Sequence, residues 1–115
     1  MAATGGRLGA LLWAAQRASA AVLAICVLVH LVTMVLAVRG GLSAAEILGR
    51  TQGSTGWFAF YLLFAAAVSV HAPIGLRSIA AEWTGWRGRG LDLATLAAAL
   101  ALFAWAVRAM WGVFR

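Results

Sequence analysis

The sequence predicts an all-α membrane protein with three transmembrane helices. Of its 115 residues, 64% are apolar and only 10% are charged, whereas a soluble domain has about 45–50% apolar and about 25% charged residues. The mean hydropathy of +0.95 leaves too few polar side chains to cover a water-facing surface. We therefore expect residues 1–115 to form a single membrane domain with lipid as its solvent.

The first predicted span covers about residues 11–38. Residues 18–38 form an uncharged run of 21 residues, which is about 30 Å of helix and matches the hydrocarbon thickness of a bilayer. The run follows an interrupted apolar stretch and lacks a small-residue cleavage site that leads into a polar segment, so we expect it to be retained rather than removed as a signal peptide. Cys26, the single cysteine, lies inside the run and is expected to be a packing residue.

Two further spans are predicted at about residues 57–80 and 91–114. The second opens with an uncharged run of 20 residues, 57–76, and contains Pro73, which predicts a local kink because proline has no N–H to donate within the helix. The third is long enough to cross the membrane if the side chain of Arg108 extends to the lipid headgroups. Between the first two spans we expect a short interfacial helix around residues 44–48.

The charge pattern argues for a membrane and against nucleic acid as a partner. Nine arginines and three acidic residues give a formal net charge of +6, with no lysine. The arginines are spread singly between long apolar runs, as expected of residues that flank membrane spans. Five lie on the N-terminal side and four on the other, which weakly favours a cytoplasmic N-terminus. The two groups are Arg7, Arg17, Arg77, Arg87 and Arg89, and Arg39, Arg50, Arg108 and Arg115.

His30 and His71 are the ionisable residues nearest the middle of the predicted spans. Such groups are costly in hydrocarbon, so they usually face the interior of a bundle. There they bind a metal, belong to a proton path or contact a partner side chain. A packed interhelical hydrogen bond is the simpler interpretation of either histidine. No carboxylate lies in the interior of a span, which weighs against a proton-coupled transporter.

The surroundings of His71 favour haem binding. Gly75 lies one turn further on the same face and would let a flat macrocycle approach the backbone, with Ser78 and Glu82 continuing that stripe. Arg77, at the end of the uncharged run, is suited to pair with a haem propionate.

The first span carries a stripe of small and polar residues of the kind that packs helices closely: Ser19, Cys26, His30 and Thr33. Gln16 and Arg17 lie near its membrane surface, where they could bind a propionate or a quinone carbonyl.

Residue counting places the two histidines at different depths. If Arg17 and Arg77 mark the same membrane surface, His30 lies about 20 Å inward and His71 about 9 Å inward. Two axial ligand nitrogens of one iron are only about 4 Å apart, twice a metal–nitrogen bond of about 2 Å. We therefore expect each haem to take its second histidine from another chain, and expect Ser19, Ala20 and Gly75 to allow the close helix approach that such sharing requires.

These residues resemble the membrane-anchor cytochrome b of succinate dehydrogenase and fumarate reductase. The second-helix pattern of that family reads here as His71, Gly75, Arg77 and Glu82, with Ser78 in place of the frequent histidine and Glu82 in place of the frequent aspartate. Its first-helix Arg-x-Ser-Gly element is matched by residues 17–20 except that alanine replaces the glycine, and Trp13 replaces a quinone-site serine. His30, fourteen residues after Gln16, is similar to the di-haem branch. The resemblance spans about residues 16–82.

The resemblance implies three transmembrane helices that form part of a haem-binding bundle. Haem b, one or two groups shared with a partner chain, and quinone would be its cofactors. His71 and His30 would ligate iron, with Arg17, Arg77, Gly75, Ser19 and Gln16 around haem and quinone. The partners would be flavoprotein and iron–sulfur subunits and a second copy or a related three-span anchor, in a bacterial-type inner membrane. The chain would pass electrons to or from quinone.

Two other functions remain open at this point. One is another quinone-linked b-type subunit that serves a different dehydrogenase. The other is a haem-free helical anchor or small transporter subunit whose two histidines make interhelical hydrogen bonds. In each case the flavin and dicarboxylate chemistry belongs to other chains, because this sequence has neither a dinucleotide-binding fingerprint nor the cysteines that an iron–sulfur cluster requires.

Overall fold

The computed structural model describes the backbone of residues 2–41 and 43–115, and the side chains of residues 6–41 and 43–115. The described residues form four helices: α1 (Ala2–Arg39), α2 (Ala44–Thr51), α3 (Thr55–Thr84) and α4 (Arg89–Phe114). Three of them contain segments long and apolar enough to cross a membrane, Gly6–Arg39, Thr55–Thr84 and Arg89–Phe114. The prediction of an all-α membrane protein with three spans is therefore confirmed, and the short helix expected near residue 44 is α2.

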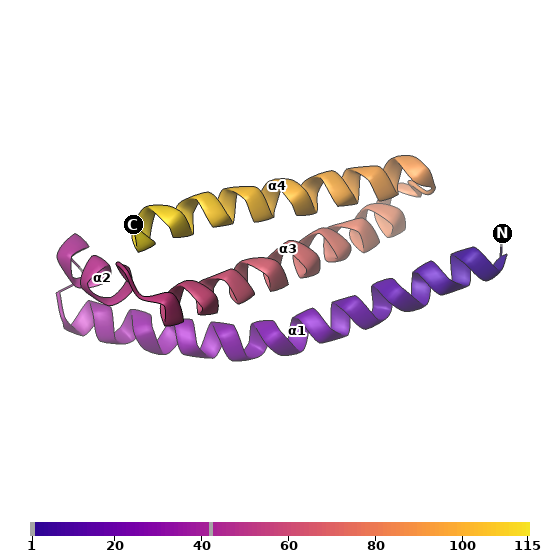
Figure 1. Cartoon of the computed structure of the whole chain (residues 1–115). Helices are drawn as coiled ribbons and strands as arrows, with labels where there is room; N and C mark the ends of the chain where they lie inside the picture. Colours follow the sequence, from indigo (N-terminus) through magenta and orange to yellow (C-terminus); the bar gives the residue numbers. More distant parts are fainter. Residues whose placement is uncertain (1, 42) are drawn as a thin grey trace.

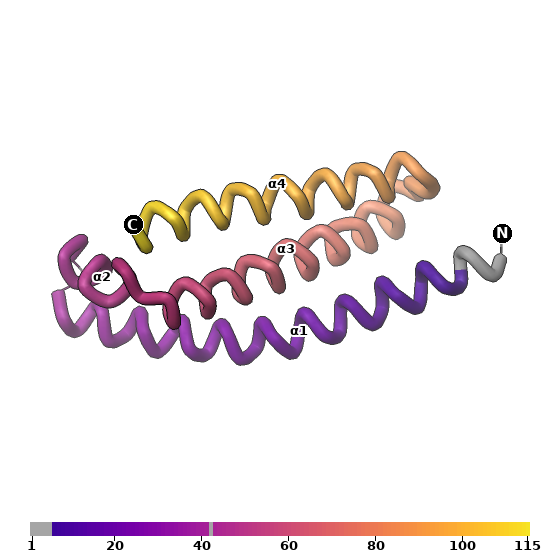
Figure 2. The backbone as a smooth tube through the Cα atoms, in the orientation of Figure 1, coloured from indigo at the N-terminus to yellow at the C-terminus, as the bar shows by residue number. Residues whose placement is uncertain are grey.

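The three long helices lie side by side, with α3 between α1 and α4 (Figure 1). The start of α1 lies at the same end of the bundle as the α3–α4 connection, whereas α2 and the end of α4 lie at the other end (Figure 2). The molecule measures 54 × 25 × 23 Å. The contact between α1 and α3 positions both histidines, because His71 of α3 faces Ser19 of α1 and His30 of α1 faces Tyr61 of α3.

On α1 and α3, small side chains form the buried part of these helix contacts. On α1 the buried residues include Ser19, Cys26 and Ala37, and Cys26 is only 2% exposed, as expected of a packing residue. On α3 they are Ala65, Ala67, Ser69, Pro73 and Ala81. Many large apolar side chains instead point outward, as is suitable for a protein whose solvent is lipid, whereas Leu91 and Met110 of α4 are buried.

The helix ends carry ordinary capping residues. The Ser43 side chain accepts a hydrogen bond from the Glu46 N–H at the start of α2. The Ser54 side chain accepts one from the Trp57 N–H at the start of α3. Gly85 ends α3 with a positive φ of 73°, a conformation that glycine adopts without steric cost. Helix α3 is continuous through Pro73.

The end of α2 and the two residues after it form hydrogen bonds with the C-terminal end of α4. The Thr51 hydroxyl donates to the Val113 carbonyl at 3.0 Å, and the Gly53 N–H donates to the Phe114 carbonyl at 2.7 Å. The Gln52 side-chain amide donates to the Arg115 carbonyl at 2.7 Å. The last carbonyls of a helix have no hydrogen-bond donor within the helix. These three bonds therefore supply donors that α4 itself lacks.

Candidate functional site

Three contacts fix the antiparallel register of α1 and α3. Gln16 lies against Gly75, Ser19 against His71, and His30 against Tyr61. A step of eleven residues along α1, from Ser19 to His30, therefore corresponds to a step of ten residues back along α3. At 1.5 Å per residue, the two histidines lie about 15 Å apart along the bundle.

This register agrees with the two levels predicted by residue counting. The ligand nitrogens of a bis-histidine iron lie only about 4 Å apart, so His30 and His71 of one chain do not share an iron in this arrangement.

His71 faces the hydroxyl of Ser19 across the α1–α3 contact. The Ser19 Oγ lies 3.4 Å from His71 Nδ1 and donates to the Gln16 carbonyl at 3.1 Å. Ser19 is buried and His71 is half-buried. In the described part of the chain the hydrogen-bond contact of this ring is at Nδ1, so Nε2 is the nitrogen left to bind a metal or another partner.

Gly75 and Gln16 complete this cluster. A Cβ built on Gly75 would lie 3.5 Å from Gln16 Nε2, so the side-chain amide of Gln16 lies beside the glycine. Gln16 Oε1 is buried and has no hydrogen-bond partner among the described residues, a state that costs about 1–3 kcal/mol.

The chain thus brings four predicted site residues together: Gln16, Ser19, His71 and Gly75. The close approach expected of Ser19 and Gly75 at a partner interface is instead made between α1 and α3, because both residues lie in that contact.

His30 lies in an aromatic environment at the other level. Its Nδ1 is 3.5 Å from the Tyr61 hydroxyl, and its ring meets Phe64 edge-on with the centroids 5.6 Å apart. It also lines a groove of about 270 Å³ between α1, α2, α3 and α4. Tyr61 and Phe64 were not among the predicted site residues, although their spacing of three residues on the second span places both on one helix face.

The two arginines predicted to lie near the haem lie apart from the His71 cluster. The Arg17 guanidinium stacks over the Trp13 ring, 5.4 Å from its centroid. Arg77 extends toward α4, where its Nε and Nη2 donate to Asp92 Oδ1 at 3.0 and 2.8 Å. Asp92 was not predicted as a site residue, and its only sequence signal is an acid in the first turn of the third span. A propionate role for Arg17 and Arg77 stays a prediction.

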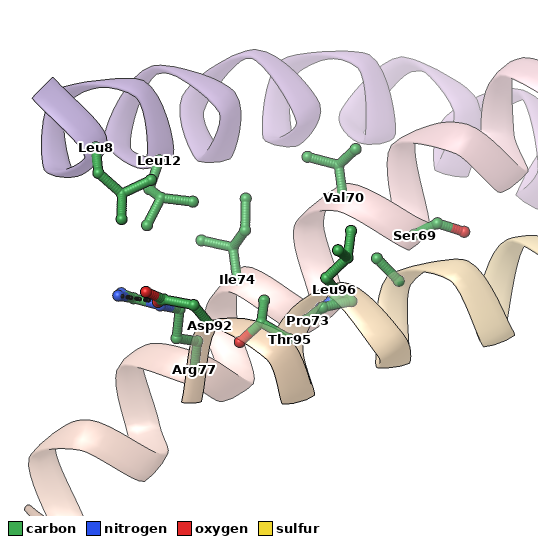
Figure 3. A pocket seen from close by; sticks show the side chains of 11 residues that line it. Leu8, Leu12, Ser69, Val70, Pro73, Ile74, Arg77, Asp92, Thr95 and Leu96 are labelled. Carbon is green, nitrogen blue, oxygen red and sulfur yellow. Dashed lines mark hydrogen bonds and ion pairs between the residues drawn. The ribbon is translucent and has the colours of Figure 1, made fainter. Parts of the chain in front are cut away.

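The Arg77–Asp92 pair borders a groove of about 350 Å³ between the start of α1, α3 and α4 (Figure 3). Leu8 and Leu12 of α1 face Ile74 of α3 across it. The hydroxyls of Ser69 and Thr95 also line it, but each donates to a carbonyl of its own helix. The groove therefore suits an apolar occupant, and neither histidine lines it.

The metal chemistry open to these residues is limited. Within residues 2–41 and 43–115, no three or more His, Cys, Asp or Glu side chains come close enough to hold a metal ion together. A prosthetic group that brings its own iron needs only one axial histidine from the chain, and both histidines can supply one.

Comparison with protein families gives one match. The model of the succinate dehydrogenase/fumarate reductase transmembrane subunit family matches residues 3–109, a range that includes both histidines and most of α4. Comparison with curated proteins and with solved structures gave no match.

Proposed function

Because the chain belongs to the succinate dehydrogenase/fumarate reductase transmembrane subunit family, we propose that it is a haem b-binding membrane anchor of such a complex. In this role it passes electrons between a peripheral iron–sulfur and flavin module and membrane quinone. The observation that carries the proposal is the cluster at the α1–α3 contact, in which His71 turns Nδ1 toward Ser19 while Nε2 has no hydrogen-bond partner among the described residues. Metal-bound histidines commonly bond the protein through their second ring nitrogen in this way.

The two histidines take separate haems in this proposal. His71 ligates the haem nearer the dehydrogenase side, and His30 ligates a second haem nearer the opposite surface. Bound haem b supplies one-electron redox chemistry, while the chain supplies axial nitrogens and polar groups around the porphyrin. The separation of about 15 Å along the bundle supports two sites rather than one.

A second chain completes each site. Two bis-histidine haems need four axial histidines, and this chain has two. A second copy related by an axis along the membrane normal would bring His30 opposite His30 and His71 opposite His71. A related three-span anchor with the same pattern would serve equally well. The anchor then joins flavoprotein and iron–sulfur subunits.

Quinone binds, in this proposal, near the start of α1. Gln16 supports this placement because its buried Oε1 has no partner among the described residues and can accept a hydrogen bond from a quinol hydroxyl. The guanidinium of Arg17 and the region of Ser19 lie on the same stretch of helix and provide further polar groups.

We place the protein in a bacterial-type inner membrane with the N-terminus of α1 in the cytoplasm. Arg17, Arg77, Glu82 and Trp83 then lie beside the peripheral module. Reporter fusions at the two chain ends test this placement: an active cytoplasmic reporter at the N-terminus supports it, and one at the C-terminus contradicts it.

Haem content of the purified complex tests the proposal. Reduced-minus-oxidised spectra and a pyridine haemochrome assay are compared for the wild type, His71→Ala and His30→Leu. We expect His71→Ala to lose one b-type signal and His30→Leu to lose the other, with both variants still inserted in the membrane. Ser78→Ala, at an exposed position of α3, is the control and keeps both signals. Unchanged haem content in His71→Ala would refute the assignment of that ligand.

A haem-free anchor is the second candidate, and one observation favours it. Each histidine already faces a hydroxyl on the neighbouring helix, Ser19 for His71 and Tyr61 for His30. At 3.4 and 3.5 Å these contacts are longer than the usual 2.7–3.2 Å of hydrogen bonds to nitrogen, so they are weak interhelical hydrogen bonds in the chain without haem. The absence of any b-type spectrum in the wild-type complex would support this second function.

A further inference from the structure

The hydrogen-bond contacts of Ser19 favour one position for the proton of the His71 ring. A serine hydroxyl has one proton to donate and lone pairs with which to accept. The Ser19 proton is used in the bond to the Gln16 carbonyl at 3.1 Å. What remains at Oγ, 3.4 Å from His71 Nδ1, is an acceptor. The neutral ring therefore satisfies this contact when its proton is on Nδ1.

We propose that Ser19 is a positioning residue that holds His71 in the tautomer with an unprotonated Nε2, the form in which imidazole binds iron through that atom. Ser19 is only 6% exposed, so water does not compete freely for either of its contacts. This inference rests on the proposed haem function for its consequence, but the tautomer itself is a property of the chain without haem.

The contact at His30 differs from that at His71 because the hydroxyl that faces the ring has its proton free. The Tyr61 hydroxyl, 3.5 Å from His30 Nδ1, makes no other hydrogen bond in the described part of the chain. Its proton is therefore free to point toward Nδ1 or away from it, and either tautomer of His30 fits. The nearby Thr33 hydroxyl donates to the His30 carbonyl and does not reach the ring. Of the two histidines, only His71 therefore has a contact that favours one tautomer.

The Ser19 contact has a predictable effect on a bound iron. A hydrogen bond from Nδ1–H makes the imidazole a stronger electron donor and holds the ring in one orientation. Stronger donation favours the oxidised iron, so loss of the acceptor shifts the midpoint potential of the His71 haem to more positive values. Loss of such an outer partner typically weakens metal binding about 10- to 100-fold. We therefore also expect the chain to retain haem less tightly when the Ser19 acceptor is removed.

The first experiment measures the chain without haem. Ring ¹⁵N NMR shifts of His71 are recorded for the full chain in detergent, at a pH where the imidazole is neutral. We expect the Nδ1–H form in the wild type and in Ser19→Thr, and a mixture of tautomers in Ser19→Ala. Ser69→Ala is a matched control, since Ser69 is also buried and donates to a carbonyl of its own helix, Ala65. A wild-type ring protonated mainly on Nε2, or a Ser19→Ala ring that does not change, would overturn the proposal.

The second experiment measures the assembled complex with haem. We expect Ser19→Ala to shift one midpoint potential positively and to change the electron paramagnetic resonance g values of that haem, whereas Ser19→Thr and Ser69→Ala retain the wild-type values. A potential that is the same in Ser19→Ala and wild type, or that moves equally in Ser69→Ala, would contradict the positioning role. A wild-type complex without haem would refute the proposed function instead, while the NMR result would still decide the tautomer.

Discussion

Arg77 on α3 donates two hydrogen bonds to one carboxylate oxygen of Asp92 on α4, from Nε at 3.0 Å and from Nη2 at 2.8 Å. The side chains are 25% and 41% exposed, so the pair lies at the edge of the helix contact rather than within it. It joins α3 to α4 at the end of the bundle where α1 begins. The guanidinium was predicted to bind a propionate, and that role would require it to share its donors with Asp92 or to leave it.

We predict a small coupling energy between these two residues. In a double-mutant cycle with Arg77→Gln and Asp92→Asn, thermal unfolding in detergent should give a coupling of about 0.5–1 kcal/mol, because exposure to solvent weakens the attraction. The Arg50–Glu46 pair, at 3.7 Å within α2, is the control and should give about 0.3–0.5 kcal/mol. A coupling well above this range at Arg77 would show that the pair is shielded from water by lipid or by a partner.

We predict that Gly75→Ala leaves the fold intact but lowers haem content. The added Cβ would lie 3.5 Å from Gln16 Nε2, an ordinary contact, and alanine is favoured over glycine in a helix by about 1 kcal/mol. The added methyl group would still keep a haem macrocycle that lies against residue 75 from approaching the helix backbone closely. Gly112→Ala, whose Cβ meets nothing within 4 Å, is the control for helix propensity. Equal haem content in the two variants would place the macrocycle elsewhere.

We predict that Gln16→Leu stabilises the isolated chain. The variant removes a buried oxygen without a partner, so unfolding in detergent should become more costly by about 1 kcal/mol. Gln52→Leu serves as the comparison because it removes a bond that is made, from Nε2 to the Arg115 carbonyl, and should bring no gain. If Gln16→Leu instead destabilises the chain, its oxygen has a partner in the detergent-solubilised protein.

We predict that Thr51→Val loosens the end of α4. Thr51 is 8% exposed, and its hydroxyl lies 3.0 Å from both the Ile47 and the Val113 carbonyls, between which its single proton is shared. Loss of this hydroxyl should cost about 1 kcal/mol. Hydrogen exchange of the last turn of α4 should become faster. Thr95→Val, which removes a bond only within α4, should leave that turn unchanged. Equal exchange rates in the wild type and Thr51→Val would mean that the other two bonds to α4 are sufficient.

The sequence allowed the helices and the two histidine levels to be predicted because both depend on distance along the chain. In hydrocarbon, a backbone must satisfy its own hydrogen bonds, so long uncharged runs become helices. A fixed rise per residue then converts the positions of His30 and His71 into depths. The small residues Ser19 and Cys26 were also recognised as a packing stripe, and both are buried.

The partners of individual side chains could not be predicted in the same way. Whether Arg77 faces a cofactor or Asp92 depends on how α3 is rotated about its own axis, which the apolar pattern of a lipid-exposed helix does not determine. The contact of Gln16 with Gly75 depends on the register of two helices far apart in sequence. The bonds from the α2–α3 segment to α4 are mainly to backbone carbonyls, which carry no residue-specific signal.

The bonded end of α4 changes what the membrane must provide on that side. A helix whose last carbonyls are bare has to reach hydrated headgroups, because each unbonded group costs several kcal/mol in hydrocarbon. Here Thr51, Gln52 and Gly53 supply the donors that water would otherwise supply. The end of α4 therefore depends less on interfacial water for its hydrogen bonds than a helix with bare carbonyls does.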